Sequence, residues 1–253
     1  MSDTPLLSVI MPAHNAEGIL PRSLGALRNS DLARDRWELV LVDDGSSDDT
    51  AALVEARPEA AGSVPGVSLR VLGVRHGGKG AAVRAGMLAA EGEIVIFADA
   101  DMATPPDQIP LLALALADND VALGSRIQPD GSDMRASQPG YRRLLGKVFH
   151  ILASAWVAGP VQDTQCGFKG FSRDAAHDLF ARQRITSIVF DVEVIYLARR
   201  RGYRMAVVPV RWFDKRGSRM RASLGLTMRV AWDLFRIPLM HRRAATMRSR
   251  VRT

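Results

Sequence analysis

Hydrophobic and polar positions change their spacing repeatedly along the first half of the chain. Five short apolar runs have the length and composition of buried strands, and they lie at 6–11, 37–44, 67–74, 93–99 and 120–125. Apolar residues recur at helical spacing in four intervening segments, at 16–28, 48–57, 78–90 and 107–117. Apolar strands that alternate with helices are typical of a parallel sheet built from right-handed crossovers. This half therefore predicts an α/β fold.

The second half is richer in helical patterns. Residues 127–140 are polar and predict a loop, and 203–210 predicts one more strand. Helical spacing predicts further helices at 141–159, 172–182, 190–201 and 222–243. No repeat or low-complexity linker interrupts the chain, so we expect one large domain, 5–220, followed by an amphipathic helical extension, 221–253.

Composition is that of a globular protein with enough apolar material for a core. The chain has 253 residues, of which 47% are hydrophobic. The single cysteine, Cys166, excludes an internal disulfide and a cysteine-based zinc site; it predicts a packing residue in a reducing compartment, the cytoplasm. No signal peptide or run of about 18 apolar residues is present, so we expect a soluble or peripheral protein.

Charge is distributed unevenly. Residues 199–253 carry 16 Lys and Arg against two Asp, whereas residues 1–198 carry 18 basic against 25 acidic residues. This asymmetry predicts an anionic partner for the C-terminal part, either a lipid surface or nucleic acid. Aromatic residues do not interleave with the basic ones as in a nucleic-acid platform, so we expect no nucleic acid.

Polar side chains lie at the carboxyl ends of three of the predicted strands. They are residues 14–15, residues 43–44, and Asp99 with Asp101. Ligands bind beyond the carboxyl ends of the strands in sheets of this kind. Asp99 and Asp101 suit a hard cation such as Mg²⁺ or Mn²⁺ together with phosphate oxygens, although helix capping or plain surface exposure would also explain them.

Two further segments leave two interpretations open. The stretch LVDDGSSDDT, 41–50, is typical of a turn with a helix cap, and its acids could also bind a nucleotide base or ribose. The glycine-rich stretch RHGGKGAAVRAG, 75–86, is either a structural turn or a phosphate site at a helix N-terminus, where Lys79 would add charge.

Taken together, these segments resemble the nucleotide-sugar domain of family 2 inverting glycosyltransferases. The similarity begins with SVIMPAHNAEGIL, LVDDGSSDDT, GGKGAAVRAG and IFADADMATPPD. It continues through GSR, VQDTQCGFKGFSRDAA, FDVEVIYLARRRGY and RWFDKRGSRM, so that it covers roughly 5–243. The whole set resembles the polyprenyl-phosphate branch, which includes dolichyl-phosphate β-glucosyltransferases and dolichyl-phosphate mannose synthases. It implies a GT-A-like, Rossmann-like fold with a mostly parallel sheet flanked by helices.

The resemblance implies roles on the donor side. The implied nucleotide-sugar site consists of Pro12, Ala13, Asn15, Asp43, Asp44, Lys79, Asp99 and Arg219. Asp99 and Asp101 would hold Mg²⁺ or Mn²⁺, which neutralises the departing nucleoside diphosphate. The chain departs from the family where His76 and Gly77 replace an asparagine and an arginine, and where Arg219 replaces the usual lysine.

The resemblance also implies an acceptor side. Arg126, with Arg142 or Arg143, would bind the lipid phosphate. The implied catalytic residues are Asp101, Arg126 and Asp191, although Asp191 could also cap a helix. Residues with implied sugar contacts or positioning roles are Asp163, Gln165 and Glu193.

The implied reaction moves glucose from UDP-glucose, or mannose from GDP-mannose, onto a polyprenyl phosphate with inversion. A phosphate monoester has a second pKa of about 6, so it can attack without a strong general base. The same fold acting on a soluble or glycan acceptor is the alternative, and a basic protein that binds nucleic acid is a remote one. The helix at 224–243 predicts contact with an anionic membrane surface, or else packing on its own domain.

Overall fold

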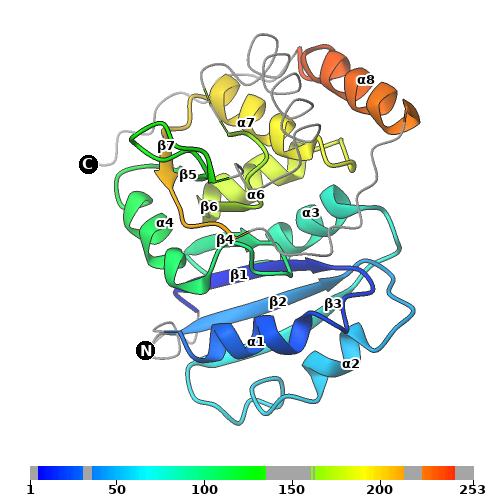
Figure 1. Ribbon diagram of the computed structural model, residues 1–253, viewed down its shortest axis with the longest axis vertical. Helices are drawn as coiled ribbons and strands as arrows, with labels where there is room; N and C mark the ends of the chain where they lie inside the picture. Colours follow the sequence, from blue (N-terminus) through cyan, green and yellow to red (C-terminus); the bar gives the residue numbers. More distant parts are fainter. Residues whose placement is uncertain (1–4, 31–35, 135–160, 162, 214–223, 243–253) are drawn as a thin grey trace.

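The fold is a seven-stranded sheet with helices on both faces (Figure 1). The computed structural model describes residues 5–30, 36–134, 161, 163–213 and 224–242. The strands are β1 (Leu7–Ala13), β2 (Trp37–Asp43), β3 (Val67–Gly73), β4 (Ile94–Ala98), β5 (Val121–Ser125), β6 (Phe168–Ser172) and β7 (Met205–Pro209). The helices are α1 (Leu20–Arg28), α2 (Thr50–Glu55), α3 (Lys79–Ala89), α4 (Ile109–Ala115), α6 (Arg173–Arg182), α7 (Phe190–Arg201) and α8 (Leu224–Met240).

The sheet has the order β3-β2-β1-β4-β6-β5-β7. Strands β1 to β4 are mutually parallel where they pair, and β5 pairs with β7 in parallel as well. The prediction of a mostly parallel α/β sheet is therefore confirmed. The six strands predicted from apolar runs are all present, and their ends lie within two residues of the expected ones.

Strand β6 is the element that the sequence pattern missed. It lies between β4 and β5 and is antiparallel to both. Its sequence, FKGFS, carries a lysine and a glycine in an apolar run, so neither composition nor alternation marks it as a central strand. Glycine suits residue 170 because a Cβ there would lie 3.1 Å from the Leu116 side chain and 3.4 Å from that of Leu112, which cover this strand.

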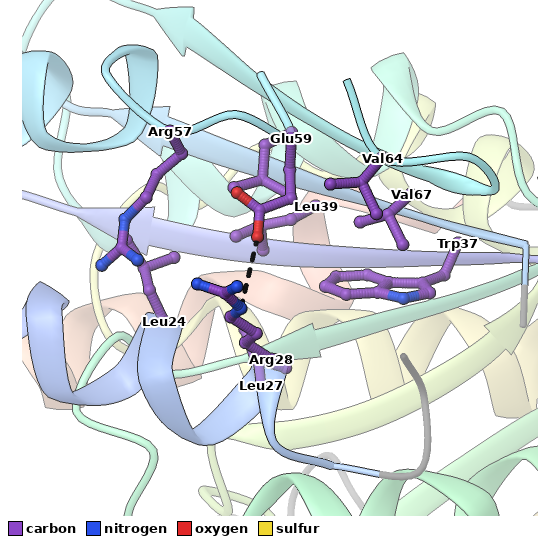
Figure 2. A pocket seen from close by; sticks show the side chains of 10 residues that line it. Leu24, Leu27, Arg28, Trp37, Leu39, Arg57, Glu59, Val64 and Val67 are labelled. Atoms are coloured by element: carbon purple, nitrogen blue, oxygen red, sulfur yellow. Dashed lines mark ion pairs between the residues drawn. The ribbon is translucent and has the colours of Figure 1, made fainter. Parts of the chain in front are cut away.

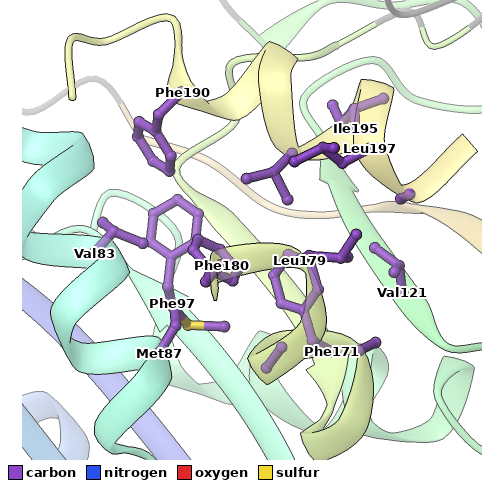
Figure 3. Close-up of a cluster of buried hydrophobic side chains, with 14 of the residues drawn as sticks. Val83, Met87, Phe97, Val121, Phe171, Leu179, Phe180, Phe190, Ile195 and Leu197 are labelled. Carbon is purple, nitrogen blue, oxygen red and sulfur yellow. The ribbon is translucent and has the colours of Figure 1, made fainter. Parts of the chain in front are cut away.

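Each face of the sheet carries its own apolar core. Alternate strand residues point to opposite faces, so Ile10 packs under α3 while its neighbours Val9 and Met11 pack under α1. The face covered by α3, α6 and α7 is rich in phenylalanine (Figure 3), and Phe171 meets Phe180 edge-on at 5.3 Å between ring centroids. These buried cores fix where each strand ends, and hence where its polar residues project.

Helix α8 packs against α7 near the end of the described chain. Leu234 and Ile237 are buried in the core under α7, and Ser187 donates a hydrogen bond to Asp233 at 2.6 Å. The predicted helix at 141–159 lies outside the described residues. Within the described ranges, every helix is too short or too polar to cross a bilayer.

Candidate active site

Polar residues after β1, β2 and β4 lie at one edge of the sheet, as the parallel topology predicts. The β1–β2 register ends with Pro12 opposite Val42 and Ala13 opposite Asp43. Pro12 and Ala13 are buried, so they form the floor of this edge. The residues implied for nucleotide binding therefore converge from several strands on the carboxyl edge.

Asn15 joins the loops that follow β1 and β2. Its Oδ1 accepts the Ser47 N–H at 2.8 Å, and its own N–H donates to Ser46 Oγ at 2.9 Å. Asp43 Oδ1 accepts the Ser46 N–H at 3.0 Å. Asn15 has a φ of 50°, in the left-handed region that asparagine adopts more readily than most residues. Asn15 and Asp43 thus hold the loop that begins at residue 44.

Asp44 binds the glycine-rich segment before α3. The side chain is buried, and its two oxygens accept the N–H groups of Gly77 at 2.8 Å and Gly78 at 3.0 Å. Two residues further on, the N–H of Gly80 donates to the carbonyl of Thr186 at 2.9 Å. Of the two interpretations of this segment, the structure supports the turn, because the anion bound by its N–H groups is Asp44 itself.

Lys79 is the cation that the closely spaced carboxylates require. Its Nζ lies 2.6 Å from Asp99 Oδ1, and the two side chains are 32% and 37% exposed. Burial alone would lower the pKa of Lys79, but the carboxylates of Asp99, Asp191 and Asp101 outweigh it and raise that pKa. Lys79 is therefore protonated at neutral pH and holds a positive charge beside Asp99.

The Asp99–Asp101 segment forms a tight turn at the end of β4. The Met102 N–H donates to the Asp99 carbonyl at 2.9 Å, and Asp101 Oδ1 accepts the Ala103 N–H at 3.0 Å. Met102 has a φ of 48°; in the described part of the chain only it and Asn15 combine a positive φ with a side chain. Such strained backbone concentrates at functional sites.

The surroundings of Asp99 fit a small cation. A Cβ at Gly167 would lie 2.0 Å from Asp99 Oδ2, so this carboxylate can take its position only because residue 167 is glycine. Two carboxylates offer the hard oxygen ligands that Mg²⁺ and Mn²⁺ take. Asp99 also lines a small hollow together with Ala98, Met102, Ala103, Thr104, Gly167, Phe168 and Trp212.

A second lysine–carboxylate pair lies beneath the first. Lys169 Nζ, on β6, lies 2.7 Å from Asp191 Oδ1, on α7, and both side chains are buried. Both lysines approach the ring of Phe97, with Lys79 Nζ at 5.7 Å and Lys169 Nζ at 5.5 Å from its centroid. Burial raises the pKa of Asp191, and the two lysines oppose that rise. Sequence reasoning missed Lys169, and its signal was a lysine within the apolar run GFKGF.

Arg126 and Asp163 form a clamp just after β5. Arg126 Nε lies 2.8 Å from Asp163 Oδ2, and Arg126 Nη2 lies 2.6 Å from Asp163 Oδ1. The backbone N–H of Arg126 also donates to Asp163 Oδ2 at 2.9 Å. The guanidinium carbon is 5.7 Å from the ring centroid of Trp212. This two-point contact fixes the plane of the guanidinium and raises the pKa of Arg126 against the lowering effect of burial.

Glu193 is placed apart from these groups. It is fully buried on α7, where it accepts the N–H groups of Arg184 at 3.0 Å and Ile185 at 2.8 Å. His241 Nε2 lies 2.6 Å from the same carboxylate. Glu193 therefore connects α7 to the loop before it and to the end of α8. Gln165 is half-buried in the turn that precedes β6.

The remaining implied residues, Arg142, Arg143 and Arg219, lie outside the described residues. A pocket of about 210 Å³ is lined by none of the implied site residues (Figure 2). It opens between α1 and the amino ends of β2 and β3, where Trp37 and Val67 begin their strands. Arg28 and Glu59 face each other across it at 3.9 Å. Its position at the amino edge separates it from the strand-end chemistry.

The family of the chain follows from comparison with known proteins. The model of the family described as glycosyl transferase family 2 matches residues 8–180. The chain belongs to this family. The matched residues include both carboxylates of the turn after β4, Lys79, and the Arg126–Asp163 clamp.

Curated relatives of this family 2 chain share one description. A dolichyl-phosphate beta-glucosyltransferase from Drosophila melanogaster is 34% identical over 253 residues, covering 94% of the chain and 76% of the relative. The Homo sapiens protein of the same description is 33% identical over 233 residues, covering 87% of the chain and 71% of the relative. The predicted resemblance to the polyprenyl-phosphate branch is confirmed.

Solved structures confirm the GT-A-like fold. A glucosyl-3-phosphoglycerate synthase from Mycobacterium tuberculosis, determined with Mn²⁺, UDP and phosphoglyceric acid, matches with a TM-score of 0.63 and 20% identity. That match covers 97% of this chain and 80% of the other. TarS from S. aureus, in complex with UDP-GlcNAc, matches with a TM-score of 0.60 and 20% identity, covering 92% of this chain and 66% of TarS residues 1–349.

Proposed function

We propose that the protein transfers glucose, with inversion, from UDP-glucose to the phosphate of a polyprenyl phosphate. The observation that carries this proposal is the contact between Lys79 and Asp99 at the carboxyl edge of the sheet. A carboxylate suited to a cation and a lysine suited to a diphosphate meet at one point there. The shared description of the relatives supports the glucosyl donor and the lipid acceptor.

On the donor side, each group has a defined task. We propose Mg²⁺ or Mn²⁺ on Asp99 and Asp101, where the bound cation would neutralise the charge on the departing UDP. Lys79 turns from Asp99 towards the diphosphate and keeps its proton, because its pKa is raised. Asp44, Asn15 and the loop they hold supply the wall against which the base and ribose bind.

On the acceptor side, the reaction needs a positioned nucleophile. A phosphate oxygen of the lipid forms the new bond to the anomeric carbon from the face opposite UDP, and the bond from that carbon to the UDP oxygen breaks. The acceptor is already ionised at neutral pH, so no proton has to be removed. Arg126 orients the phosphate, and Asp163 is the positioning residue that holds the guanidinium.

Asp191 also receives a positioning role in this proposal. Its carboxylate contacts the buried Lys169, and Lys169 lies under the same Phe97 ring as Lys79. We therefore place Asp191 and Lys169 next to the reacting groups, where the charge of Asp191 helps to raise the pKa of Lys79.

Contact with an anionic membrane surface, at the cytoplasmic face, is the second part of the proposal. Helix α8 exposes Met228, Trp232 and Phe235, with exposed fractions of 66%, 60% and 47%. These residues and Leu239 recur at helical spacing and form one apolar stripe, while the opposite side of the helix packs on α7. An apolar stripe with arginines beside it is suited to an interface that presents a lipid phosphate.

The decisive experiment separates donors and acceptors in one assay. The purified full chain is incubated with Mn²⁺, a polyprenyl phosphate in detergent, and labelled UDP-glucose or GDP-mannose in parallel reactions. We expect label in the organic phase with UDP-glucose and at least 10²-fold less with Asp101→Ala, which removes one candidate cation ligand. Transfer with GDP-mannose alone would contradict glucose as the transferred sugar. Transfer only to a water-soluble acceptor would contradict the polyprenyl phosphate as the acceptor.

A further inference from the structure

Three metal-ligating side chains meet at the carboxyl ends of β1, β2 and β3. His14 follows β1, Asp44 follows β2, and His76 lies in the loop after β3. Their ligand atoms all lie within 4.8 Å of one another. The two imidazole rings stack with centroids 4.4 Å apart. Within the described ranges, no other group of three such side chains approaches this closely.

The spacing of His76 and the Asp44 carboxylate is that of two ligands in one coordination sphere, and His14 lies close beside them. His76 Nδ1 lies 2.9 Å from Asp44 Oδ2 and 3.0 Å from the Asp44 carbonyl oxygen. His14 Nδ1 lies 2.9 Å from the same carbonyl oxygen. Ligands about 2.0–2.1 Å from one metal ion are separated by about 2.8–3.4 Å in octahedral or tetrahedral arrangements.

The central ligand is held in place by a second set of contacts. Asp44 is 3% exposed, and the N–H groups of Gly77 and Gly78 bind its two oxygens at 2.8 and 3.0 Å. Gly45 has a φ of 68°, and a Cβ there would lie 3.1 Å from the His76 backbone nitrogen. Glycine at residue 45 therefore lets His76 approach. Outer contacts of this kind orient a ligand before the metal arrives.

We propose that His14, Asp44 and His76 form a binding site for a transition-metal ion of the zinc class. Two imidazoles and one carboxylate suit Zn²⁺, Ni²⁺ and Cu²⁺, whereas Mg²⁺ prefers oxygen ligands alone. The site is separate from Asp99 and Asp101 and takes a different class of metal. It goes beyond the proposed function, since neither histidine has a task in the transfer described above.

One consequence rests on the proposed function. Asp44 belongs to the wall proposed for the nucleotide base, so a bound zinc ion and UDP compete for this edge of the sheet. Zinc binding itself is independent of that competition. The experiment therefore measures zinc binding directly and tests competition with UDP afterwards.

In the test, the purified full chain is titrated with Zn²⁺ in the presence of excess Mg²⁺, and isothermal titration calorimetry measures the binding. We expect one equivalent of tightly bound Zn²⁺, and affinity at least about 10-fold lower in His76→Asn and in His14→Phe, because loss of outer contacts alone has effects of that size. His177→Asn is the matched control, because His177 is a partly buried histidine on α6 that contacts Ala90. Both His14 and His76 are exposed, so we expect circular dichroism and thermal unfolding to show an intact fold in these variants.

Two outcomes would overturn the proposal. The first is unchanged zinc affinity in both histidine variants. The second is binding that Asp101→Asn abolishes and His76→Asn does not, which would place the ion on the turn after β4. Visible absorption of bound Co²⁺ gives an independent readout, since its bands change when an imidazole ligand is lost. If zinc binds but UDP does not compete with it, the metal site stands and the proposed role of Asp44 in binding the nucleotide base is contradicted.

Discussion

At the scale of single residues, the function depends on how charges of opposite sign are paired before any ligand binds. Lys79 neutralises Asp99, and Asp163 neutralises Arg126. Each pair keeps ionised and oriented a group that we propose for binding a charged ligand. The pairs differ in exposure, because Asp163 is almost fully buried whereas both partners of the Lys79 pair are about a third exposed. Lys79 can therefore change partner, while Arg126 is held.

This difference makes Lys79 a sensitive position. Lys79→Met removes the cation beside Asp99, so we expect kcat/KM for the nucleotide sugar to fall about 10²-fold, in the range found when one preorganised donor is lost. Steady-state kinetics at saturating Mn²⁺ measure the change. Arg75→Met is the matched control, since Arg75 is an exposed cation in the same loop. Equal loss in both variants would show a general charge effect instead.

Cys166 illustrates a residue whose burial decides its chemistry. It is 1% exposed beside Asp163, and burial raises the pKa of its thiol from 9.0 to about 12. At neutral pH the thiolate fraction falls on the order of 10³-fold, so we expect the native protein to resist a thiol reagent such as DTNB. The urea-unfolded chain should react at once. A native rate within tenfold of the unfolded rate would contradict this environment.

At the scale of elements, β6 carries a structural charge into the centre of the sheet. Lys169 and Asp191 are both buried, and removing one partner of such a pair leaves an uncompensated charge. We expect Lys169→Met to lower the free energy of unfolding by about 3–5 kcal/mol, measured by urea denaturation. The double variant Lys169→Met/Asp191→Leu should recover most of that loss. A single variant within about 1 kcal/mol of wild type would show that the pair is dispensable.

Helix α8 has two faces with different tasks. Leu234 and Ile237 anchor it on α7, while Trp232 and Phe235 point away with ring centroids 6.0 Å apart. Trp232→Glu leaves the anchored face intact and places a charge in the apolar stripe. We expect the fraction bound to phosphatidylglycerol vesicles in a flotation assay to fall severalfold.

Leu114→Glu is the matched control for this change, because Leu114 is 74% exposed on α4, away from α8. Equal vesicle binding of Trp232→Glu and wild type would contradict the membrane contact. Equal loss in both variants would indicate a general effect of added negative charge.

At the scale of the whole molecule, charge separation matters more than net charge. The chain carries +7 overall, yet its C-terminal 55 residues hold almost half of the 34 basic side chains. We expect binding to anionic vesicles to weaken as salt shortens the Debye length from about 10 Å at 0.1 M to about 3 Å at 1 M. Binding to neutral phosphatidylcholine vesicles should be weak throughout. Salt-independent binding would show that the apolar stripe acts alone.

The apolar spacing of the sequence was enough to predict six of the seven described strands, the helices between them and the edge at which the polar residues gather. Buried strands read as apolar runs, and parallel strands place their last residues at the same edge, so Asp44 and Asp99 could be brought together by topology alone. The motifs around them were specific enough to predict the family. None of this required knowledge of side-chain contacts.

The contacts that those residues make depend on tertiary packing. Asp44 binds Gly77 and Gly78, and Asp191 binds Lys169, across 22 to 34 positions of sequence. Local periodicity reports which face of an element is buried, but it does not report which distant polar group a buried carboxylate meets. The antiparallel strand β6 escaped prediction for the same reason, because its buried lysine donates to the Cys166 carbonyl and pairs with Asp191, a carboxylate on a helix that follows it in the chain.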